Sequence, residues 1–393
     1  MRASCQRSAP AAIFARIAGY LPPGAPDPEM PRYDDAALGA ALASFVDPSA
    51  DETLEALGAV EQATVDDGRA RVRLRFGFPV GGYAHELQPL LAAHLAARGI
   101  ALPLELELVA DIAAHAVQRQ LKPLATVHNV IAVASGKGGV GKSTVAANLA
   151  LAWAAQGARV GILDADIYGP SQPLMLGLAG ERPEIGAGKR IHALSAHGIV
   201  AMSIGFLIDA DQPMVWRGPM VTQALTQLLN DTLWGQLDYL VVDMPPGTGD
   251  IQLTLAQRVP VAGAIIVTTP QHIAVADARK GLRMFEKVSV PVLGIVENMS
   301  LHVCSNCGHA EPIFGAGGGD EMAREYGVAL LGRLPLDARI REEADGGRPS
   351  VVAAPDSPRA AAYFTMARRT AAALARRARH VRGAFPDIIV EDT

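Results

Sequence analysis

The sequence contains few cysteines and no long apolar run. Its 393 residues include only three cysteines, Cys5, Cys304 and Cys307. An odd and sparse set of this kind does not form the disulfide framework of a small secreted protein, so a reducing, cytoplasmic compartment is expected. No apolar run reaches the ~18–20 residues that a membrane-spanning helix needs. We therefore expect no membrane partner.

The chain also lacks an excess of positive charge. Lysine and arginine number 35 against 40 aspartates and glutamates, which gives a formal net charge of −5. This balance argues against a protein that coats nucleic acid, and no nucleic-acid partner is expected. Half of the residues are apolar and only 19% are charged, which excludes disorder over most of the length. A chain of this size is expected to form two or three domains.

Composition and periodicity divide the chain into four segments. Residues 1–33 are rich in proline and have no acidic residue before Asp27, so a disordered extension is expected, although their arginines also resemble a weak targeting segment. Residues 34–122 mix helical and strand periodicity and predict a small α+β accessory domain without readable chemistry. Residues 123–382 form the larger domain, and residues 383–393 form a C-terminal tail.

Two local patterns define the expected folds. In the small segment, Asp67-Gly68 lies between two alternating stretches and predicts a β-hairpin. In the large segment, short apolar runs alternate with helical stretches, which predicts an α/β fold: a mostly parallel sheet covered by helices on both faces. The apolar runs cover residues 130–134, 160–163, 200–204, 239–242, 264–267, 292–296 and 329–331.

The first of these runs leads directly into a phosphate-binding loop, followed by a helix expected over residues 143–156. The sequence fits G-x-x-x-x-G-K-S/T, the motif of P-loop NTPases. Glycines let backbone N–H groups converge on phosphate oxygens, and the helix N-terminus adds positive potential. Lys142 would reach the β- and γ-phosphates of ATP, and the Ser143 hydroxyl would ligate Mg²⁺. The loop residues are Gly136, Lys137, Gly138, Gly139, Val140, Gly141, Lys142, Ser143 and Thr144.

A second lysine, Lys137, lies inside the loop. It could be a solvated charge that the turn tolerates. However, the variant K-G-G-V-G-K-S resembles the deviant-Walker, or signature-lysine, ATPases. In that group this lysine acts in trans, across a dimer interface, where charge builds in the transition state. The resemblance therefore implies a homodimer.

Carboxylates follow two of the apolar runs, at the end of a parallel sheet where ligands bind. Asp164 and Asp166 follow the run at 160–163, and either could orient the attacking water. Asp243 follows the run at 239–242 and could hold Mg²⁺ through water. Gly247, in the Gly/Pro-rich stretch after Asp243, could place an N–H at the γ-phosphate.

Cys304 and Cys307 form a C-x-x-C pair that allows more than one interpretation. The pair does not open a helix of a short βαβ unit, so a thioredoxin-like role is disfavoured. Zinc needs four ligands, which His302 and His309 could complete within one chain, although this spacing is tighter than usual. Two chains related by a two-fold axis would instead supply four thiolates, the ligand set of a [4Fe–4S] cluster.

Taken together, these motifs resemble the Mrp/ApbC family of iron–sulfur cluster carrier ATPases. The resemblance covers about residues 34–378 and rests on the phosphate-binding loop, on the stretches 163–171, 243–250 and 297–300, and on the cysteine pair. It implies a homodimer that binds a labile [4Fe–4S] cluster between Cys304 and Cys307 of both chains, hydrolyses ATP and passes the cluster to apo-proteins.

The same resemblance has three further implications. A cluster scaffold or donor protein would load the carrier. Asn298 would help to read the adenine base, for which an amide has the donor and the acceptor. Residues 34–122 are similar to a small domain that these carriers share with other iron–sulfur assembly factors.

Two other ATPase functions compete with the carrier. A nitrogenase iron-protein type is disfavoured because its cysteines would lie far apart in sequence. A positioning ATPase that acts on a membrane or DNA would leave the cysteine pair unexplained. The sequence feature that most favours a positioning ATPase is the stretch from Phe364 to Arg382, where an alanine-rich apolar stripe is flanked by arginines. We expect this helix to pack its stripe on the sheet and to leave its arginines in water.

Overall fold

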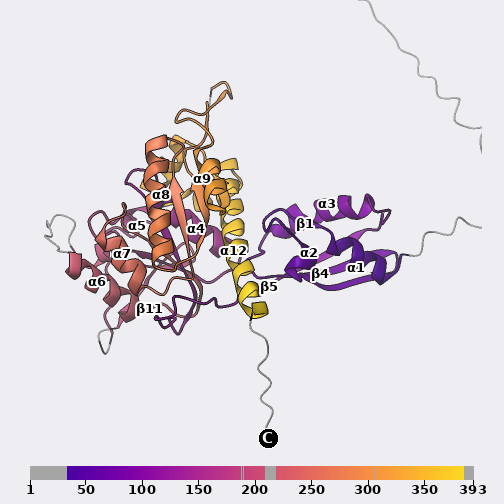
Figure 1. Ribbon diagram of the computed structural model, residues 1–393, viewed down its shortest axis with the longest axis horizontal. Helices are drawn as coiled ribbons and strands as arrows, with labels where there is room; N and C mark the ends of the chain where they lie inside the picture. Colours follow the sequence, from indigo (N-terminus) through magenta and orange to yellow (C-terminus); the bar gives the residue numbers. More distant parts are fainter. Residues whose placement is uncertain (1–32, 187, 189, 209–217, 305, 385–393) are drawn as a thin grey trace, which may run out of the picture.

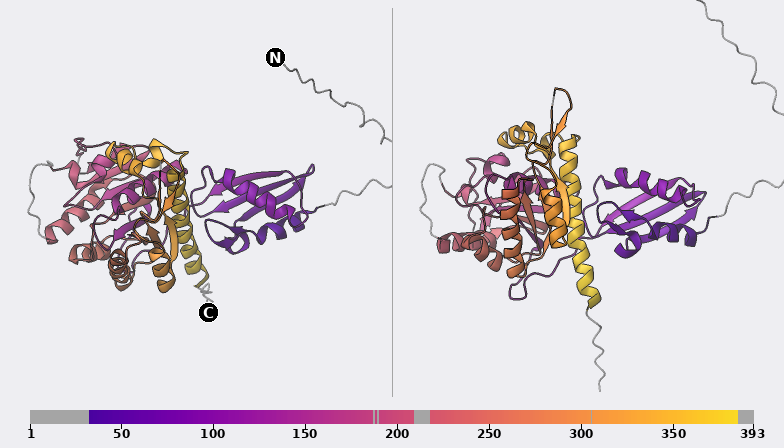
Figure 2. Two further views of the ribbon diagram at one scale, coloured as in Figure 1. Left: turned by 90° about the horizontal axis from the view of Figure 1, so that it is seen from above. Right: turned by 45° about the horizontal axis from the view of Figure 1, so that its top comes forward.

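The computed structural model describes residues 33–384, apart from 187, 189, 209–217 and 305. Almost all of the expected N-terminal extension, residues 1–32, and most of the expected tail, residues 385–393, lie outside the described residues. The described elements form a small and a large body, and helix α12 (Pro358–Ala384) lies at their junction, as Figures 1 and 2 show. Among the described helices, none combines the length and the apolar character that a membrane crossing requires.

The small body is a three-stranded sheet with helices on one face. In β4, Ala70, Val72, Leu74 and Phe76 are buried against these helices, while the alternating arginines lie on the open face. These arginines pair with carboxylates across the neighbouring strands, so the open face is compatible with water. The elements are α1 (Asp35–Ala43), β1 (Val46–Asp47), β2 (Glu52–Thr53), α2 (Leu54–Leu57), β3 (Val60–Asp66), β4 (Arg69–Phe76), α3 (Tyr83–Ala96) and β5 (Leu104–Ala110).

The predicted hairpin joins β3 to β4. Asp67 and Gly68 both have positive φ angles, 48° and 72°, as a two-residue hairpin turn requires, and Asp66 pairs with Arg69. This part of the sequence prediction is confirmed. Strand β5 lies parallel to β4, because α3 carries the chain back across the sheet before β5 begins.

The large body contains an eight-stranded sheet with the order β17-β14-β13-β6-β12-β7-β10-β9. All strands are parallel except β9, and all seven predicted apolar runs are strands of this sheet. The α/β fold class is therefore confirmed. The strands are β6 (Val127–Ser135), β7 (Val160–Asp164), β9 (Leu194–Ala196), β10 (Ile199–Ser203), β12 (Leu237–Asp243), β13 (Gly263–Thr268), β14 (Val292–Glu297) and β17 (Ala329–Arg333).

Helices cover both faces of this sheet (Figure 1). The elements outside the large sheet are α4 (Lys142–Ala155), α5 (Gln172–Met175), β8 (Ile191–His192), the short helix η2 (Ile204–Phe206), α6 (Gly218–Asp231), β11 (Thr232–Leu233), α7 (Asp250–Arg258), α8 (His272–Lys287), β15 (His302–Val303), β16 (Ala310–Glu311), α9 (Gly318–Tyr326), α10 (Ala338–Asp345) and α11 (Ser350–Ala353). Helix α4, which begins at the phosphate loop, is buried at Lys142 and at the nine consecutive positions 145–153.

The strand order places three functional strands side by side. Strand β12 pairs with β6 on one side and with β7 on the other, and Asp243 lies opposite both Val133 and Asp164. The carboxyl ends of these strands therefore meet at one edge, directly beside the phosphate loop that follows β6. In open parallel sheets, ligands bind at this edge.

Helix α12 docks on the large body as expected, and Arg369 and Arg377 are exposed as expected, but Arg368 is not. Ala367, Ala371 and Leu374 are buried where the helix packs against α4 and the sheet, and Trp153 Nε1 donates a hydrogen bond to the Ala367 carbonyl (2.8 Å). Arg368 is only 3% exposed, pairs with Glu86 of α3 and lies 4.7 Å from the centre of the Tyr83 ring. The arginine attaches the helix to the small body instead of facing water, because a planar guanidinium can form an ion pair and stack on an aromatic ring at once.

Candidate functional site

The phosphate loop lies between the end of β6 and the start of α4, where tertiary contacts constrain two of its glycines. A Cβ atom on Gly136 would lie 2.1 Å from the backbone carbon of Asp277 in α8. On Gly141, which has a φ of 81°, a Cβ would lie 2.3 Å from the Asn298 amide nitrogen. Gly138, by contrast, has no atom closer than 3.9 Å. Gly136 therefore serves helix packing, a reason that the motif alone does not give.

We expect Gly136→Ala to destabilise the protein, whereas Gly138→Ala is tolerated. A methyl group at position 136 forces the loop away from the Asp277 backbone, which costs about 1–3 kcal/mol or more of unfolding free energy. Thermal and denaturant unfolding of the two variants measures the difference. Equal stability of both variants would contradict the packing of the loop against α8.

Behind the loop, Lys142 forms a buried network with three other residues. Lys142 is 5% exposed, and its Nζ forms an ion pair with the fully buried Asp243 and donates to Ser143 Oγ (3.1 Å). The Gln172 amide donates to Asp243 Oδ2 (2.9 Å) and to the Ser143 carbonyl (3.1 Å). The structure thus brings Lys142, which was predicted to bind phosphate, together with Ser143 and Asp243, which were predicted to hold Mg²⁺. Sequence reasoning missed Gln172, because nothing in its local sequence signals a contact with two distant segments.

The two carboxylates after β7, Asp164 and Asp166, have different surroundings. Asp164 is fully buried and accepts hydrogen bonds from the backbone N–H groups of Asp166 (3.1 Å), Ser171 (3.0 Å) and Gln172 (3.0 Å), and from the Ser203 hydroxyl (3.2 Å). Burial and the neighbouring Asp243 carboxylate raise the pKa of Asp164 to about 7. Three of these hydrogen bonds come from residues 166–172 and one comes from Ser203 of β10, so both oxygens of Asp164 accept hydrogen bonds within the fold.

Asp166 differs from Asp164 in that its side chain is only partly buried. Burial raises the pKa of Asp166, and the nearby Lys142 ammonium opposes this shift. Of the two carboxylates named from the sequence, Asp166 is the more exposed, and Asp164 lies inside the sheet edge. Which of them orients the attacking water stays a prediction.

Three other predicted residues also lie at the loop. The Asn298 amide is buried and donates to the Val140 carbonyl (2.9 Å), which buttresses the loop from β14. The Gly247 N–H donates to the Ser135 carbonyl (3.1 Å), so it would reach a phosphate only after this bond opened. Lys137 is half-buried, and within the described part of the chain its ammonium has no hydrogen bond or ion pair. The roles in adenine reading, γ-phosphate binding and trans action stay predictions.

The cysteine pair lies on a hairpin formed by β15 and β16, which projects from the large body (orange in Figures 1 and 2). The Cys304 N–H donates to the His309 carbonyl, and the Gly308 N–H donates to the Cys304 carbonyl, both at 2.9 Å. Cys307 is exposed and Cys304 is partly exposed. Hydrogen bonds from the backbone N–H groups of Cys307 and Asn306 lower the pKa of Cys304. The hairpin thus presents two accessible thiols, and the lowered pKa favours the thiolate form of Cys304.

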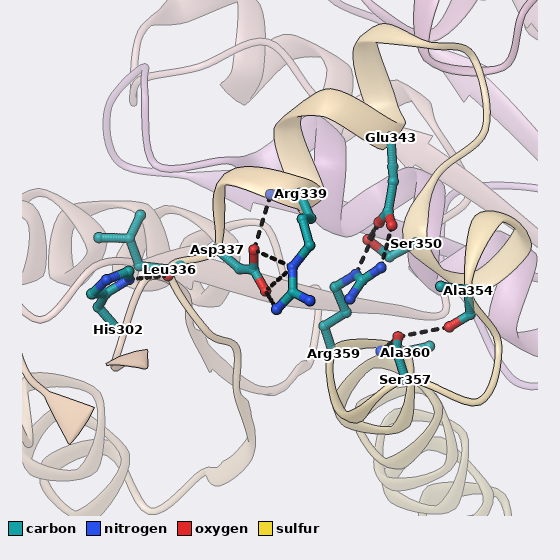
Figure 3. A network of polar contacts seen from close by, with 10 residues as sticks. All are labelled: His302, Leu336, Asp337, Arg339, Glu343, Ser350, Ala354, Ser357, Arg359 and Ala360. Carbon is teal, nitrogen blue, oxygen red and sulfur yellow. Dashed lines mark hydrogen bonds and ion pairs between the residues drawn. The ribbon is translucent and has the colours of Figure 1, made fainter. Parts of the chain in front are cut away.

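The Cys₂His₂ zinc alternative has no support in the geometry of one chain. The His302 ring nitrogen Nδ1 hydrogen bonds to the Leu336 carbonyl (3.0 Å) at the base of the hairpin, as Figure 3 shows. In the same view, ion pairs of Asp337 with Arg339 and of Glu343 with Arg359 secure the segment behind it. Over the described residues, no group of three or more histidine, cysteine, aspartate or glutamate side chains could hold a metal ion.

A glycine loop between a buried strand and a helix, with its lysine facing a carboxylate at the next strand end, defines a P-loop NTPase. The sequence model of the family described as ParA, NUBPL iron-transfer P-loop NTPase, matches residues 126–371, and the chain belongs to this family. The family resemblance and the P-loop NTPase fold predicted from the sequence are thereby confirmed.

Curated relatives and one solved structure agree with this assignment. An iron-sulfur cluster carrier protein of Escherichia coli (strain K12) is 50% identical over 339 residues, which cover 86% of this chain and 92% of the relative. One of Pseudomonas fragi is 62% identical over 264 residues, 67% of this chain and 92% of the relative. The mouse iron-sulfur cluster transfer protein NUBPL is 53% identical over 248 residues, 63% of this chain and 77% of the relative.

The structural likeness is to a nucleotide-binding protein of Archaeoglobus fulgidus, solved in complex with ADP. It is 41% identical, has a TM-score of 0.51, and the match covers 57% of this chain and 88% of that one. This coverage is consistent with a shared NTPase core.

Proposed function

We propose that this chain is an ATP-hydrolysing carrier that binds a [4Fe–4S] cluster as its cargo between two copies and passes it to apo-proteins. The observation that carries this proposal is the projecting hairpin with Cys304 and Cys307, found in a chain of an iron-transfer NTPase family. Accessible, weakly enclosed thiols suit a cargo that must be released. They also require a reducing compartment, so we place the protein in the cytoplasm.

The number of thiols supports a homodimer. A [4Fe–4S] cluster takes four cysteine ligands, whereas one hairpin offers two. A two-fold axis through the hairpin tips would bring together two copies of the same pair, and such isologous pairing is the commonest form of oligomer. Exposed apolar side chains beside the cysteines, Leu301, Val303 and Ile313, would be shielded from water in such a pair.

The proposed nucleotide site is the buried network around Lys142. Ser143 and Asp243 offer the hydroxyl and carboxylate oxygens that Mg²⁺ prefers, and these two residues would hold it beside the phosphates, where it would neutralise their charge. Lys142 would leave Asp243 for the phosphates as the nucleotide binds. Asp166 would orient the attacking water, and Lys137 of the second copy would reach the phosphates in trans.

Asn298, the small N-terminal body and a second protein would have supporting roles in this function. Asn298, which already contacts the loop, would read the adenine base. Residues 34–122 would form an accessory domain of the iron–sulfur assembly type, held to the NTPase domain of residues 123–382 by Arg368. A scaffold or donor protein would supply the cluster. We do not propose the positioning ATPase, because Ala367, Ala371 and Leu374 of the apolar stripe of α12 are buried and are not available to a membrane.

Cluster transfer tests the proposal directly. The protein is reconstituted anaerobically with iron and sulfide, and mixed with the apo form of an enzyme that needs a [4Fe–4S] cluster, with and without MgATP. We expect the enzyme to recover activity in the presence of an iron chelator, because the cluster passes between proteins without release. Recovery that the chelator abolishes, or that free iron and sulfide match in rate, would contradict a carrier.

A further inference from the structure

Gln172 lies where three distant segments of the nucleotide site meet. It is the first residue of α5, it is fully buried, and its backbone N–H donates to Asp164 Oδ2 (3.0 Å). Its side-chain nitrogen donates to Asp243 Oδ2 at the end of β12 and to the Ser143 carbonyl at the start of α4. Both hydrogens of the amide group are thus used. A reversed amide would place its oxygen against two other oxygens, so the hydrogen-bond network fixes the orientation.

The oxygen of the Gln172 side-chain amide has no hydrogen-bond partner among the described residues. Gln172 Oε1 is buried and, among the described residues, accepts no hydrogen bond. An unpaired buried carbonyl is unfavourable, and such an atom in a folded protein calls for an explanation such as a bound water or ion. Oε1 is two bonds away from the nitrogen that contacts Ser143 and Asp243, so it lies close to this pair.

We propose that Gln172 is a positioning residue for the Mg²⁺–nucleotide complex: its NH₂ group orients the Asp243 carboxylate, and its Oε1 accepts a hydrogen bond from a water on Mg²⁺. Mg²⁺ keeps several of its waters when it binds to proteins, and each water has hydrogens to donate. Outer partners that orient the first ligands are a regular part of metal sites. This inference rests on the proposed nucleotide site, and it adds to that site a residue outside the phosphate-loop motif.

The fold supplies a matched control in Gln156. This glutamine caps the opposite end of α4, is 4% exposed, and also has a buried Oε1 without a partner among the described residues. The side-chain nitrogen of Gln156 donates to the carbonyl of Phe364 (3.4 Å), a residue far in sequence from both Ser143 and Asp243. Replacing either glutamine by methionine keeps the side-chain length and removes the amide. Only the change at position 172 removes a contact with the nucleotide site.

The test compares the ADP affinity of the full chain in Mg²⁺ and in EDTA. We expect Gln172→Met to weaken ADP binding by about tenfold or more in Mg²⁺ and to leave it nearly unchanged in EDTA, as loss of an outer partner of a metal site does. Gln156→Met should change neither affinity. An equal loss in both conditions, or no loss in Mg²⁺, would overturn the inference, because Gln172 would then be a bridge within the fold.

Two outcomes separate this inference from the proposed function. If the unaltered protein binds no ADP, or binds it without regard to Mg²⁺, the proposed nucleotide site fails. If the unaltered protein shows the Mg²⁺ effect and Gln172→Met keeps it in full, only the role of Gln172 fails. Should Gln172→Met not fold, Gln172→Asn withdraws the carbonyl by one methylene while it keeps a polar group, and the same selective loss is expected.

Discussion

Replacing Lys142 by alanine should abolish nucleotide hydrolysis and leave cluster binding intact. The ammonium is the group placed to reach the phosphates, and loss of one such charge-stabilising donor lowers the rate by about 100-fold or more. In the described part of the chain, Lys142 makes its polar contacts with Ser143 and Asp243 and none with the hairpin that carries Cys304 and Cys307, so reconstituted iron and sulfide content should stay at the level of the unaltered protein. Phosphate release and metal analysis of the same preparation measure both effects.

The buried ion pair adds a stability effect that needs its own control. Without Lys142, the Asp243 carboxylate is left fully buried with Gln172 as its remaining partner, which costs about 3–5 kcal/mol of unfolding free energy. The double variant Lys142→Ala with Asp243→Asn removes the stranded charge and should recover much of this loss without recovering hydrolysis. Lys137→Ala breaks no ion pair among the described residues, so this variant should be as stable as the unaltered protein. Hydrolysis in the double variant would show that Lys142 acts only within the fold.

The second large effect is expected at the cysteines. Cys304→Ala or Cys307→Ala should each abolish the broad visible absorbance and the iron and sulfide content of the reconstituted protein, because two ligands of four are lost in a symmetric pair. Both thiols are at least partly exposed, so neither change should lower the thermal stability or the ADP affinity.

The third cysteine of the chain provides the control. Cys5 lies outside the described residues, and Cys5→Ala should keep a full cluster content. A double variant of Cys304 and Cys307 that still holds iron and sulfide would contradict the assignment. Stoichiometric zinc in the unaltered protein, lost in the same variants, would restore the zinc interpretation. Size-exclusion chromatography of the loaded and the cluster-free protein should show a dimer that depends on the cysteines.

Much of the fold could be predicted because its signals are local. Parallel strands covered on both faces are continuous apolar runs, and all seven such runs are strands of the large sheet. The Asp67-Gly68 turn was equally clear, since few residues other than glycine and aspartate adopt two successive left-handed conformations. Strand β9 was missed, because three residues at a sheet edge carry no periodicity that distinguishes them from a loop.

The surroundings of two kinds of residue depend on distant segments and could not be predicted from the sequence. Arg368 was expected in water, as one arginine among several on a basic helix, but Glu86 and the Tyr83 ring from a different body cover it. Asp164 and Asp166 are two residues apart and equivalent in sequence. In the structure, backbone N–H groups of residues 166–172 donate hydrogen bonds to the fully buried Asp164, whereas Asp166 is only partly buried.

The sequence by itself determined the chemistry that consecutive residues can specify: a phosphate loop, carboxylates at strand ends, a C-x-x-C pair and the family to which they belong. Only the tertiary structure decided how these parts meet. It set Lys142 against Asp243, left Gln172 with one unpaired oxygen beside them, and raised the cysteines on a hairpin away from the sheet. The physical reason is that a motif depends on the backbone conformation of a few consecutive residues. A buried contact depends on segments that lie some 30 to 100 positions apart in sequence, and no local pattern encodes it. The contacts among Ser143, Gln172 and Asp243 are of this kind.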